Sequence, residues 1–529
     1  MRRRPRAWRL PLTLAASALL ALPFAASAEL TPEEAAGKMV FMEGKSPSGV
    51  PIQALVGPHS TPVSGEALPC ASCHGPDATG RPEGAVRPSN ITWPELTKSY
   101  GHRTEGGRER GPYTDEHFAA AVTFGTDPSG NKLDSAMPRY VMANVDIANV
   151  LAYLKRIDTD FDPGLSADRL RIGTLLPGSG RLAEAGQAMR AVMAAHLERI
   201  NAQGGIFGRQ LELVVTELPA DRAAAEEAAE EAMRSGEVFA MVAPFAVGIE
   251  QKLFDVAEAT QVPVIGPFTL SPVDHGAVNR QTFYLLPGLR DQSRALADFA
   301  AKELSLTNPI AAIVHPDGEG EVQMASALEA QLATRGWDRV VQARYSAGEM
   351  PVAKLVAALQ QQGVQVVFFL GGQRELAELG TEIRDAIWTP YLLALGARAG
   401  AAAIRLPTTF GNRVFLAYPT LPGDISEAAA TALTTDGKTA QARMGHRPAR
   451  VSAYGAVRVL EEGLKRAGSD LSRAKLAASL EKLFSFESGV MPTISYGPNR
   501  RVGALGAHIV TVDLTSHSFR PTGHYMRLD

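Results

Sequence analysis

Cysteine is nearly absent from this 529-residue chain, which has two cysteines, four tryptophans and a formal net charge of only −3. Two cysteines are too few for a disulfide-stapled scaffold or for a zinc protein with several cysteine ligands. Because there is no basic excess, no nucleic-acid partner is expected. The composition, 45% hydrophobic and 21% charged, is that of a globular protein, and the length predicts two or three domains.

Long apolar runs are also lacking, except at the N-terminus. A start rich in arginine precedes an apolar run over residues 10–28, which ends in Ala26-Ser27-Ala28. This pattern predicts a signal peptide, residues 1–28, that is cut after Ala28 during export to the periplasm. The alternative is an uncleaved membrane anchor, but Pro23 and the small residues at the end favour cleavage.

The remainder divides into two unlike halves. Residues 29–160 are rich in glycine, proline and histidine, and helical periodicity occurs only near 31–43 and 146–157. Such long loops require an organiser other than a peptide core, and a large bound cofactor would serve. Residues 169–529 alternate short apolar runs with amphipathic stretches, which is typical of parallel βαβ units. The polar segment 161–168 is the predicted linker.

The strongest chemical signal is the sequence Cys70-Ala71-Ser72-Cys73-His74. Cys-x-x-Cys-His is the attachment motif of c-type haem, because two thiols at this spacing reach two vinyl groups of one porphyrin and the histidine is then held beneath the iron. The alternatives are a redox dithiol, a disulfide and half a zinc site. A zinc site would need a second cysteine pair, and a dithiol would need a βαβ setting. We therefore expect one covalently attached haem c.

Around this motif, residues 30–158 resemble the class I cytochrome c family. The resemblance rests on the motif, on Met137-Pro138 downstream of it, and on a helix that ends near Tyr153-Leu154. It implies a small all-α domain in which His74 and Met137 are the axial ligands of the haem iron. It also implies that the carbonyl of Pro88 accepts a hydrogen bond from the His74 ring.

Other side chains compete with Met137 for the sixth position of the iron. They are Met142, His59, His102 and His117, although a methionine usually packs in a core and a surface histidine usually has no such role. A methionine ligand raises the haem potential above that of a second histidine, which implies an electron carrier of moderately high potential. The inserted residues 46–68 depart from the family pattern.

Residues from about 169 to 520 resemble the type I periplasmic solute-binding proteins of the branched-chain amino acid and amide type, which serve ABC importers. The resemblance rests on the strand at 172–177, the long helix that follows, and Gly-Gly-Ile-Phe-Gly-Arg at 204–209. The family implies a two-lobed α/β fold joined by three crossings, with a small organic solute in the cleft between the lobes. An ABC permease is then a candidate partner.

The expected ligand cleft departs from the family pattern. Phe245 stands where relatives present a pair of hydroxyls, and Phe268-Thr269 keeps only one hydroxyl. Asp291 matches an acid that could pair with an α-amino group, whereas Asp317 lies in a loop that has lost its aromatic residue. Because a carboxylate needs clustered donors to leave water, the cleft suits a small apolar or aromatic molecule better than an amino acid. Absence of any solute is the alternative.

No catalytic motif emerges from the sequence, so the chain is predicted not to be an enzyme. Three hypotheses describe the function of a chain that joins these two domains. In the first, the haem exchanges electrons with a periplasmic redox partner, such as a dehydrogenase or an oxidase-linked cytochrome, and the second module binds a solute. Family-level analogy links such binding proteins to quinoprotein alcohol dehydrogenases. The second is an importer's binding protein with an accessory haem domain, and the third is a ligand-responsive redox sensor.

Overall fold

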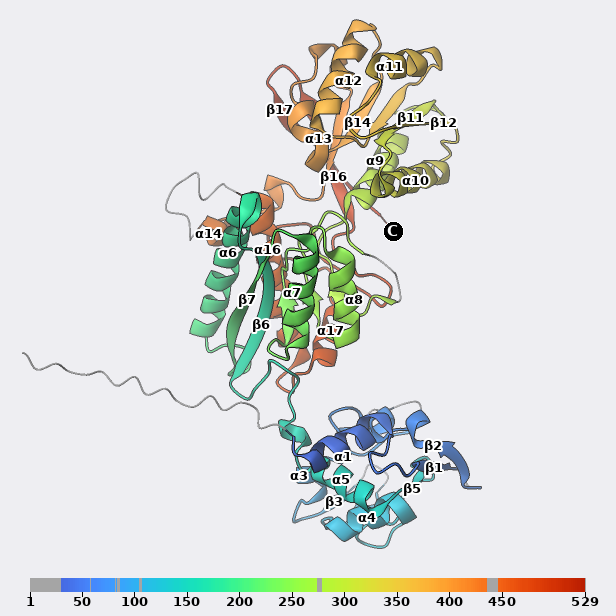
Figure 1. Ribbon diagram of the computed structural model, residues 1–529, viewed down its shortest axis with the longest axis vertical. Coiled ribbons are helices and arrows are strands. Elements are labelled where there is room, and N and C mark those ends of the chain that lie inside the picture. The colour runs from blue at the N-terminus through green and yellow to red at the C-terminus, as the bar shows by residue number, and fades with distance from the viewer. Residues whose placement is uncertain are drawn as a thin grey trace, which may run out of the picture. The chain divides into compact units, whose positions relative to one another are not determined.

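The computed structural model describes residues 30–528 except 58, 81, 83–85, 104–106, 274–277 and 435–445. The chain divides into two compact units, Met1–Phe161 and Asp162–Asp529 (Figure 1). The predicted signal segment and its cleavage site lie outside the described residues. Among the described residues, no helix combines the length and apolar character needed to cross a bilayer.

The first unit is built around two helices in contact, α1 (Pro32–Glu43) and α5 (Asn144–Leu154). They meet at Gly37, where an added Cβ would lie 1.9 Å from the carbonyl oxygen of Asn149. Glycine is therefore required for this close approach. The other helical segments of the unit are α2 (Cys70–His74), α3 (Trp93–Leu96), α4 (Asp115–Phe124) and the short 3-10 turns η1 (Gly65–Ala67) and η2 (Ile157–Thr159).

The first unit also contains β-structure, so the expectation of an all-α domain is wrong. Its strands are β1 (Gln53–Val56), β2 (Thr61–Ser64), β3 (His102–Arg103), β4 (Glu109–Arg110) and β5 (Arg139–Val141). An antiparallel sheet has the order β2-β1-β5, and β3 pairs with β4. The hairpin of β1 and β2 comes from the insertion 46–68, which buries Ile52 and Ala54 in the core of the unit. The inserted residues thus fold as an integral part of the domain.

The second unit contains a parallel sheet of five strands in the order β10-β9-β8-β6-β7. Its strands are β6 (Arg169–Pro177), β7 (Gln210–Leu218), β8 (Ala240–Val242), β9 (Val264–Ile265) and β10 (Thr282–Phe283). Figure 1 shows α6, α7 and α8 beside this sheet. The helical segments of this lobe are η3 (Gly180–Leu182), α6 (Ala183–Ala202), α7 (Arg222–Arg234), α8 (Glu250–Thr260), α14 (Glu427–Thr434), α16 (Arg447–Ala467) and α17 (Arg473–Glu481).

A second sheet has seven strands in the order β12-β11-β13-β14-β15-β16-β17, of which the last two are antiparallel. The strands are β11 (Ala311–Pro316), β12 (Val340–Tyr345), β13 (Val366–Phe369), β14 (Tyr391–Leu395), β15 (Val414–Tyr418), β16 (Gly506–Asp513) and β17 (Ser518–Arg527). The helical segments are α9 (Leu289–Glu303), α10 (Glu319–Thr334), α11 (Val352–Gln361), α12 (Gln373–Asp385), α13 (Gly396–Ala403) and the turns η5 (Thr408–Phe410) and η6 (Pro422–Asp424). The predicted two-lobed α/β fold is therefore confirmed.

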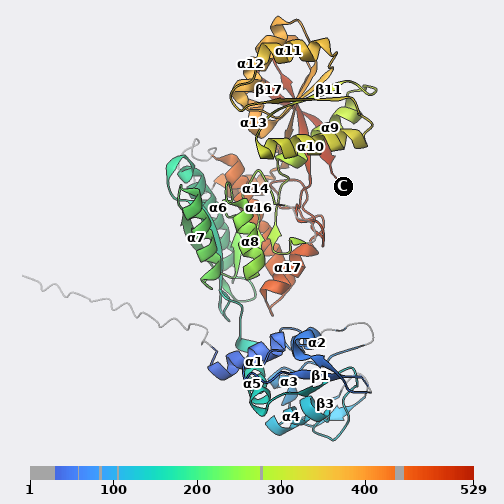
Figure 2. The same cartoon turned by 45° about the vertical axis from the view of Figure 1, so that its right-hand side comes forward.

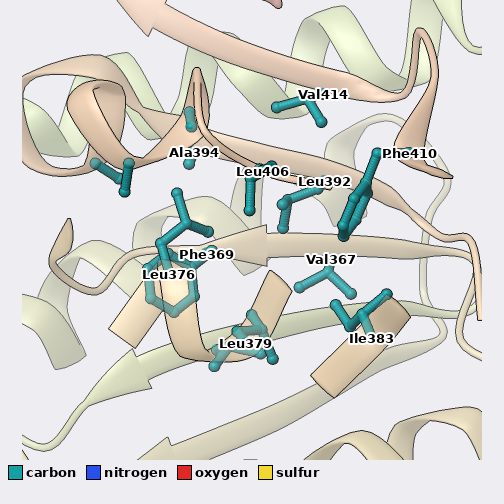
Figure 3. Close-up of a cluster of buried hydrophobic side chains, with 14 of the residues drawn as sticks. Val367, Phe369, Leu376, Leu379, Ile383, Leu392, Ala394, Leu406, Phe410 and Val414 are labelled. Carbon is teal, nitrogen blue, oxygen red and sulfur yellow. The ribbon is translucent and has the colours of Figure 1, made fainter. Parts of the chain in front are cut away.

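Helices cover both faces of the second sheet, and the central strands are consequently apolar throughout. Figure 2 shows α9 and α10 on one side of the strands, with α11, α12 and α13 on the other. Figure 3 shows one of the two resulting cores, in which Val367 and Phe369 of β13 face Leu376, Leu379 and Ile383 of α12. This packing fixes the carboxyl ends of the parallel strands, where α/β proteins place their ligands.

The segment predicted as a polar linker, 161–168, has fixed partners in the second unit. The Asp162 carboxylate accepts a hydrogen bond from the backbone N–H of Arg473 at 2.6 Å. The Arg473 guanidinium donates to the carbonyl of Pro163, and Leu165 is buried. Residues 162–165 of the predicted linker are therefore held by polar and apolar contacts within the second unit.

Candidate functional site

A cavity of about 740 Å³ lies within the first unit. Cys70, Cys73 and His74 line it together with Met137, which belongs to a distant segment of the chain. This volume is in the range of pockets that hold cofactors and other small molecules. The apolar part of the lining includes Phe41, Leu68, Leu96, Phe118, Val122, Ile147, Val150 and Leu154. We call this space the haem cavity, for the cofactor that the sequence motif predicts.

The two cysteines lie on α2, a short helix that begins after Pro69 and ends at Gly75. Residues three apart on a helix share a face, so both thiols can serve one ligand. Both cysteines are free. Burial raises the pKa of the Cys70 thiol to about 12, whereas redox dithiols depend on a lowered thiol pKa. The named strand pairs of the first unit are antiparallel, so α2 has no βαβ setting among the described residues, which argues against the dithiol alternative.

The His74 ring is held by one hydrogen bond. Its Nδ1 lies 2.9 Å from the carbonyl oxygen of Ser89. Since Nδ1 is engaged, Nε2 is the nitrogen that can bind a metal. Burial lowers the pKa of the His74 imidazole, which favours the neutral form that ligates metals.

The predicted acceptor for this bond, the carbonyl of Pro88, is wrong by one residue. The Pro88 carbonyl instead lies against Gly80, where an added Cβ would be 2.2 Å from its oxygen. Gly80 has a φ of +91°, in the left-handed region that favours glycine. The Pro88 carbonyl thus packs closely against Gly80, and the carbonyl that lies within hydrogen-bond distance of the His74 ring is that of Ser89. Pro88 still lines the haem cavity.

Met137 lies in a turn just before β5 and is half-buried. Its backbone N–H donates to the carbonyl of Asp134 at 3.2 Å, and its own carbonyl accepts a hydrogen bond from the Arg139 guanidinium. Pro138, which follows, is buried. The turn therefore has a defined backbone conformation that presents the methionine to the haem cavity.

The other candidate ligands for the sixth position of the iron divide into those that line the haem cavity and those that do not. Met142 and His102 also line the haem cavity, and His102 Nδ1 is 3.0 Å from a carboxylate oxygen of Glu95. His117 instead caps α4, because its Nδ1 accepts a hydrogen bond from the backbone N–H of Thr114 at 3.3 Å. His59 is exposed, and neither His59 nor His117 contributes to the cavity lining.

Positively charged side chains that the sequence analysis did not single out also line the haem cavity. Arg110 is only 8% exposed and donates to the carbonyls of Leu96 and Gly111 at 3.1 and 3.2 Å. The Nε of Arg108 lies 3.6 Å from the carboxylate of Asp127. Cations beside an apolar cavity fit the two carboxylates of a haem, which need charged partners away from water. No spacing in the sequence marks these arginines.

In the second unit, three of the predicted cleft residues lie together in the first lobe. Phe245 and Phe268 follow β8 and β9, pair through their backbones, and have ring centroids 5.4 Å apart. The Thr269 hydroxyl donates to a carboxylate oxygen of Glu250 at 2.9 Å. The remaining hydroxyl of the family pattern is thus engaged within the lobe, beside an aromatic pair.

The two predicted acids lie apart from this aromatic pair in the sequence and have partners of their own. Asp291 is in the first turn of α9, 5% exposed, and its Oδ1 lies 3.2 Å from Nη1 of Arg294 on the same helix. Asp317 follows β11 in the second lobe, where it is exposed and accepts a hydrogen bond from the Ser346 hydroxyl at 3.2 Å. The Arg294 partner weakens the expectation that Asp291 receives an α-amino group.

The carboxyl ends of the strands of the second lobe carry polar groups that the sequence analysis missed. Tyr345, at the end of β12, is 5% exposed, and its hydroxyl has no hydrogen-bond partner among the described residues. Burial, together with the charge of Glu375, raises the pKa of Tyr345. Arg398 at the start of α13 is 2.7 Å from a carboxylate oxygen of Glu321. The signal that could have found them is a polar residue at, or within a few residues of, the carboxyl end of a strand.

Two family models match the chain. A cytochrome c model matches residues 67–158, and a periplasmic binding protein model matches residues 169–516. The second match covers most of the chain, which therefore belongs to the periplasmic binding protein family and carries a cytochrome c domain in front of the binding fold. Both predicted resemblances are confirmed.

Particular relatives agree with this family. The Leu/Ile/Val-binding protein BraC3 of Rhizobium johnstonii is 26% identical over 68% of this chain and 92% of its own length. A Leu/Ile/Val-binding protein homolog of Brucella melitensis is 25% identical over 66% of this chain and 90% of its own length. Among solved structures, a fatty acid ABC transporter substrate-binding protein from Thermomonospora curvata has a TM-score of 0.51 at 15% identity, covering 70% of this chain and 95% of its own.

A second solved structure, an ABC transporter substrate-binding protein from Desulfitobacterium hafniense in complex with Leu, has a TM-score of 0.52 at 19% identity and covers 67% of this chain and 100% of its own. These structures establish the fold of the second unit. The cytochrome c domain implies covalent haem c, and both families are typically periplasmic. A small organic solute and an ABC permease are the partners that the binding-protein family implies.

Proposed function

We propose that the protein is a periplasmic electron carrier with one haem c bound through Cys70 and Cys73, and with His74 and Met137 as the axial ligands of the iron. The observation that carries this proposal is the common cavity. Four side chains from two distant segments line one space of about 740 Å³, with the buried cation Arg110 in its wall. The haem would supply one-electron chemistry.

The side chains of the cavity have distinct tasks in this proposal. Ser89 fixes the orientation of the His74 ring through the hydrogen bond to Nδ1. Met137 provides a neutral thioether, which raises the potential and closes the sixth position. Arg110 and Arg108 would supply positive charge to the carboxylates of a bound haem. With His74 and Met137 both available to the iron, the site would favour electron transfer over oxygen chemistry.

The electron donor and acceptor are proposed to be periplasmic redox proteins, a dehydrogenase or an oxidase-linked cytochrome. The link to a quinoprotein alcohol dehydrogenase stays a prediction, since neither a described residue nor a relative points to it. Electron transfer is the preferred role of the fusion because the residues of the haem motif are more specific than those of the cleft.

A second function, solute binding for an importer, is favoured by the family and by relatives whose names give Leu/Ile/Val binding. The Phe245–Phe268 pair supports a solute with an apolar part. The Tyr345 hydroxyl, Glu375 and Arg398 could receive a polar end on the other lobe. We propose a small organic molecule with both features as the solute.

A spectroelectrochemical titration of the haem-loaded chain tests these proposals. We expect a reversible one-electron titration and a potential typical of His/Met ligation. A thermal-shift screen first identifies solutes that bind. Repeating the titration with each of them distinguishes an importer or a simple electron carrier from a redox sensor. An unchanged potential favours an importer or a simple carrier, whereas a solute-dependent potential favours the redox sensor. Failure to titrate reversibly would contradict electron transfer.

A further inference from the structure

We call the inserted residues 46–68 the strap. The strap contacts the rest of the first unit at its beginning, in its middle and at its end. At its beginning, the hydroxyls of Ser46 and Ser48 donate to the same carboxylate oxygen of Asp146, at 2.6 and 3.0 Å. Asp146 is on α5 and is completely buried. Because a buried carboxylate needs hydrogen-bond donors, these two contacts bind the start of the strap to α5.

The middle of the strap is a strand partner for the residues that follow Met137. Strand β1 pairs antiparallel with β5, with Ala54 opposite Tyr140 and Leu55 opposite Arg139. Ala54 is fully buried in the core of the unit. The strand pairing therefore sets the position of the backbone two and three residues after Met137, and that position depends on the inserted hairpin.

The end of the strap leads directly into the haem motif. The Tyr140 hydroxyl donates to the carbonyl of Leu68 at 2.8 Å, and Leu68 lies two residues before Cys70. Tyr140 is buried and lines the haem cavity. This one hydrogen bond joins the methionine segment to the entrance of α2, which carries both cysteines and His74.

Arg139 completes the connection from the strap to Met137. Its guanidinium donates to the carbonyls of Leu133 at 3.0 Å and of Met137 itself. The side chain passes over Gly125, where an added Cβ would be 1.8 Å from the Arg139 Nε. The planar guanidinium can thus hold both ends of the turn that presents the methionine.

We propose that the strap, acting through Arg139 and Tyr140, positions Met137 for the haem iron. The two residues are positioning residues, since they act on the backbone that carries the ligand. This inference rests on the proposed function, in which Met137 is the sixth ligand. Neutral thioether ligands are weak, so their occupancy depends on how well the chain preorganises them, and supporting hydrogen bonds tune metal sites in this way.

Binding of imidazole to the ferric protein measures this positioning. Imidazole must displace the methionine, so its apparent affinity rises as the Met137 bond weakens. We expect Arg139→Gln to lower the imidazole Kd about tenfold, equivalent to about 1.4 kcal/mol. The red charge-transfer band of methionine ligation should weaken in parallel. Tyr140→Phe removes only the hydroxyl and should lower the Kd by about threefold to tenfold.

Matched controls separate positioning from general damage. Arg103→Gln removes an exposed arginine from the same domain, and Val141→Thr alters the exposed next residue of β5. Both should keep the unaltered Kd. Arg139→Lys should lower the imidazole Kd nearly as much as Arg139→Gln, because lysine lacks the guanidinium fork.

Covalent haem with an unchanged Kd and an unchanged red band in Arg139→Gln and Tyr140→Phe would overturn this inference and leave the proposed function intact. Absence of covalent haem from the unaltered chain would overturn both.

Discussion

At the scale of single residues, the proposed haem site depends on side chains that are each fixed by a backbone carbonyl. His74 is fixed by Ser89, and the Met137 turn is fixed by Arg139. Ser89 is 15 residues from His74, whereas Arg139 is only two residues from Met137. The effect of these contacts on the iron can be measured one substitution at a time.

Replacing Met137 with alanine should abolish the weak red charge-transfer band of the ferric protein. The potential should fall by more than about 60 mV, the value of a tenfold change in a one-electron equilibrium constant. Covalent haem should be retained. Met39→Ala, at an exposed position of α1, is the control and should change neither property. If Met142→Ala removes the band and Met137→Ala does not, or if the unaltered protein lacks the band and His102→Gln changes its spectrum, the sixth ligand is assigned wrongly.

The local haem motif was predictable from the sequence because its chemistry resides in five consecutive residues. The acceptor for His74 was missed by one residue, since the backbone of residues 88–89 is set by close packing with Gly80, which lies in a separate segment. Arg108 and Arg110 could not be predicted at all. Their place in the cavity depends on the fold between α3 and α4, and no periodicity marks it.

At the scale of elements, close helix contacts and buried polar clusters hold each unit together. The contact of α1 with α5 requires Gly37, and the contact of α6 with α16 buries a histidine and a carboxylate. The all-α expectation failed at this scale, because the insertion 46–68 forms a hairpin that pairs with β5. Strand pairing between distant segments has no signal in either segment alone.

The α1–α5 contact predicts a cost for any side chain at position 37. Gly37→Ala places a Cβ 1.9 Å from the carbonyl oxygen of Asn149, so the helices must separate. We expect the first unit to lose about 2–3 kcal/mol of unfolding free energy, measured by denaturant titration of the haem absorbance. Gly111→Ala is the control, since an added Cβ meets nothing within 4 Å there. Equal effects of the two substitutions would refute the close contact.

The α6–α16 contact predicts an acid-sensitive second unit. His196 Nε2 is 2.8 Å from a carboxylate oxygen of Glu461, and Lys465 donates to the same carboxylate. Burial lowers the pKa of His196, although the hydrogen bond to Glu461 opposes this. Burial disfavours ionised Glu461, but hydrogen bonds from His196 and Lys465 dominate and lower its pKa.

Both shifts have the same consequence for stability. The unfolded chain binds more protons than the folded chain once the pH falls below about 6.5 for His196 and about 4.3 for Glu461. The unfolding free energy of the second unit should therefore decrease from pH 7.5 to 5.5. His196→Gln should reduce that decrease, and His517→Gln, at an exposed histidine, should not. Urea titrations at the two pH values measure the unfolding free energy. An equal decrease in the unaltered chain and in both variants would count against a role of His196 in the acid sensitivity.

At the scale of the whole molecule, two established kinds of module share one chain. The alternation of apolar runs and amphipathic stretches was sufficient to predict the two-lobed α/β fold, because parallel sheets covered on both faces produce that pattern. The contacts that residues 162–165 of the linker make could not be predicted from such a pattern. Residues 162–165 are Asp-Pro-Gly-Leu, a turn-like sequence, but they are held by Arg473 and by burial of Leu165.

The cleft of the second unit predicts weak binding of branched-chain amino acids. The Thr269 hydroxyl is engaged by Glu250 and the Asp291 carboxylate by Arg294, so neither residue offers a zwitterion an evident free partner. We expect leucine, isoleucine and valine to bind with a Kd above about 100 μM, weaker than about −5.5 kcal/mol. Calorimetry on the full chain measures these values.

The same calorimetry identifies the contribution of the aromatic pair. Phe245→Ser should weaken the best apolar solute, whereas Phe484→Ser, at a phenylalanine that is 78% exposed, should leave its affinity unchanged. Micromolar binding of leucine that is lost in Asp291→Ala would instead favour an amino acid importer, with the haem domain as an accessory.

The central claim is that the exported chain carries one haem bound through Cys70 and Cys73, and intact-protein mass spectrometry tests it most directly. The protein should be produced in a host that matures c-type cytochromes, and its mass should be measured under denaturing conditions. The account predicts the mass of the mature polypeptide plus that of one haem, and the mass of the polypeptide alone for the Cys70→Ala, Cys73→Ala double variant. A haem-free mass for the unaltered chain under these conditions would contradict it.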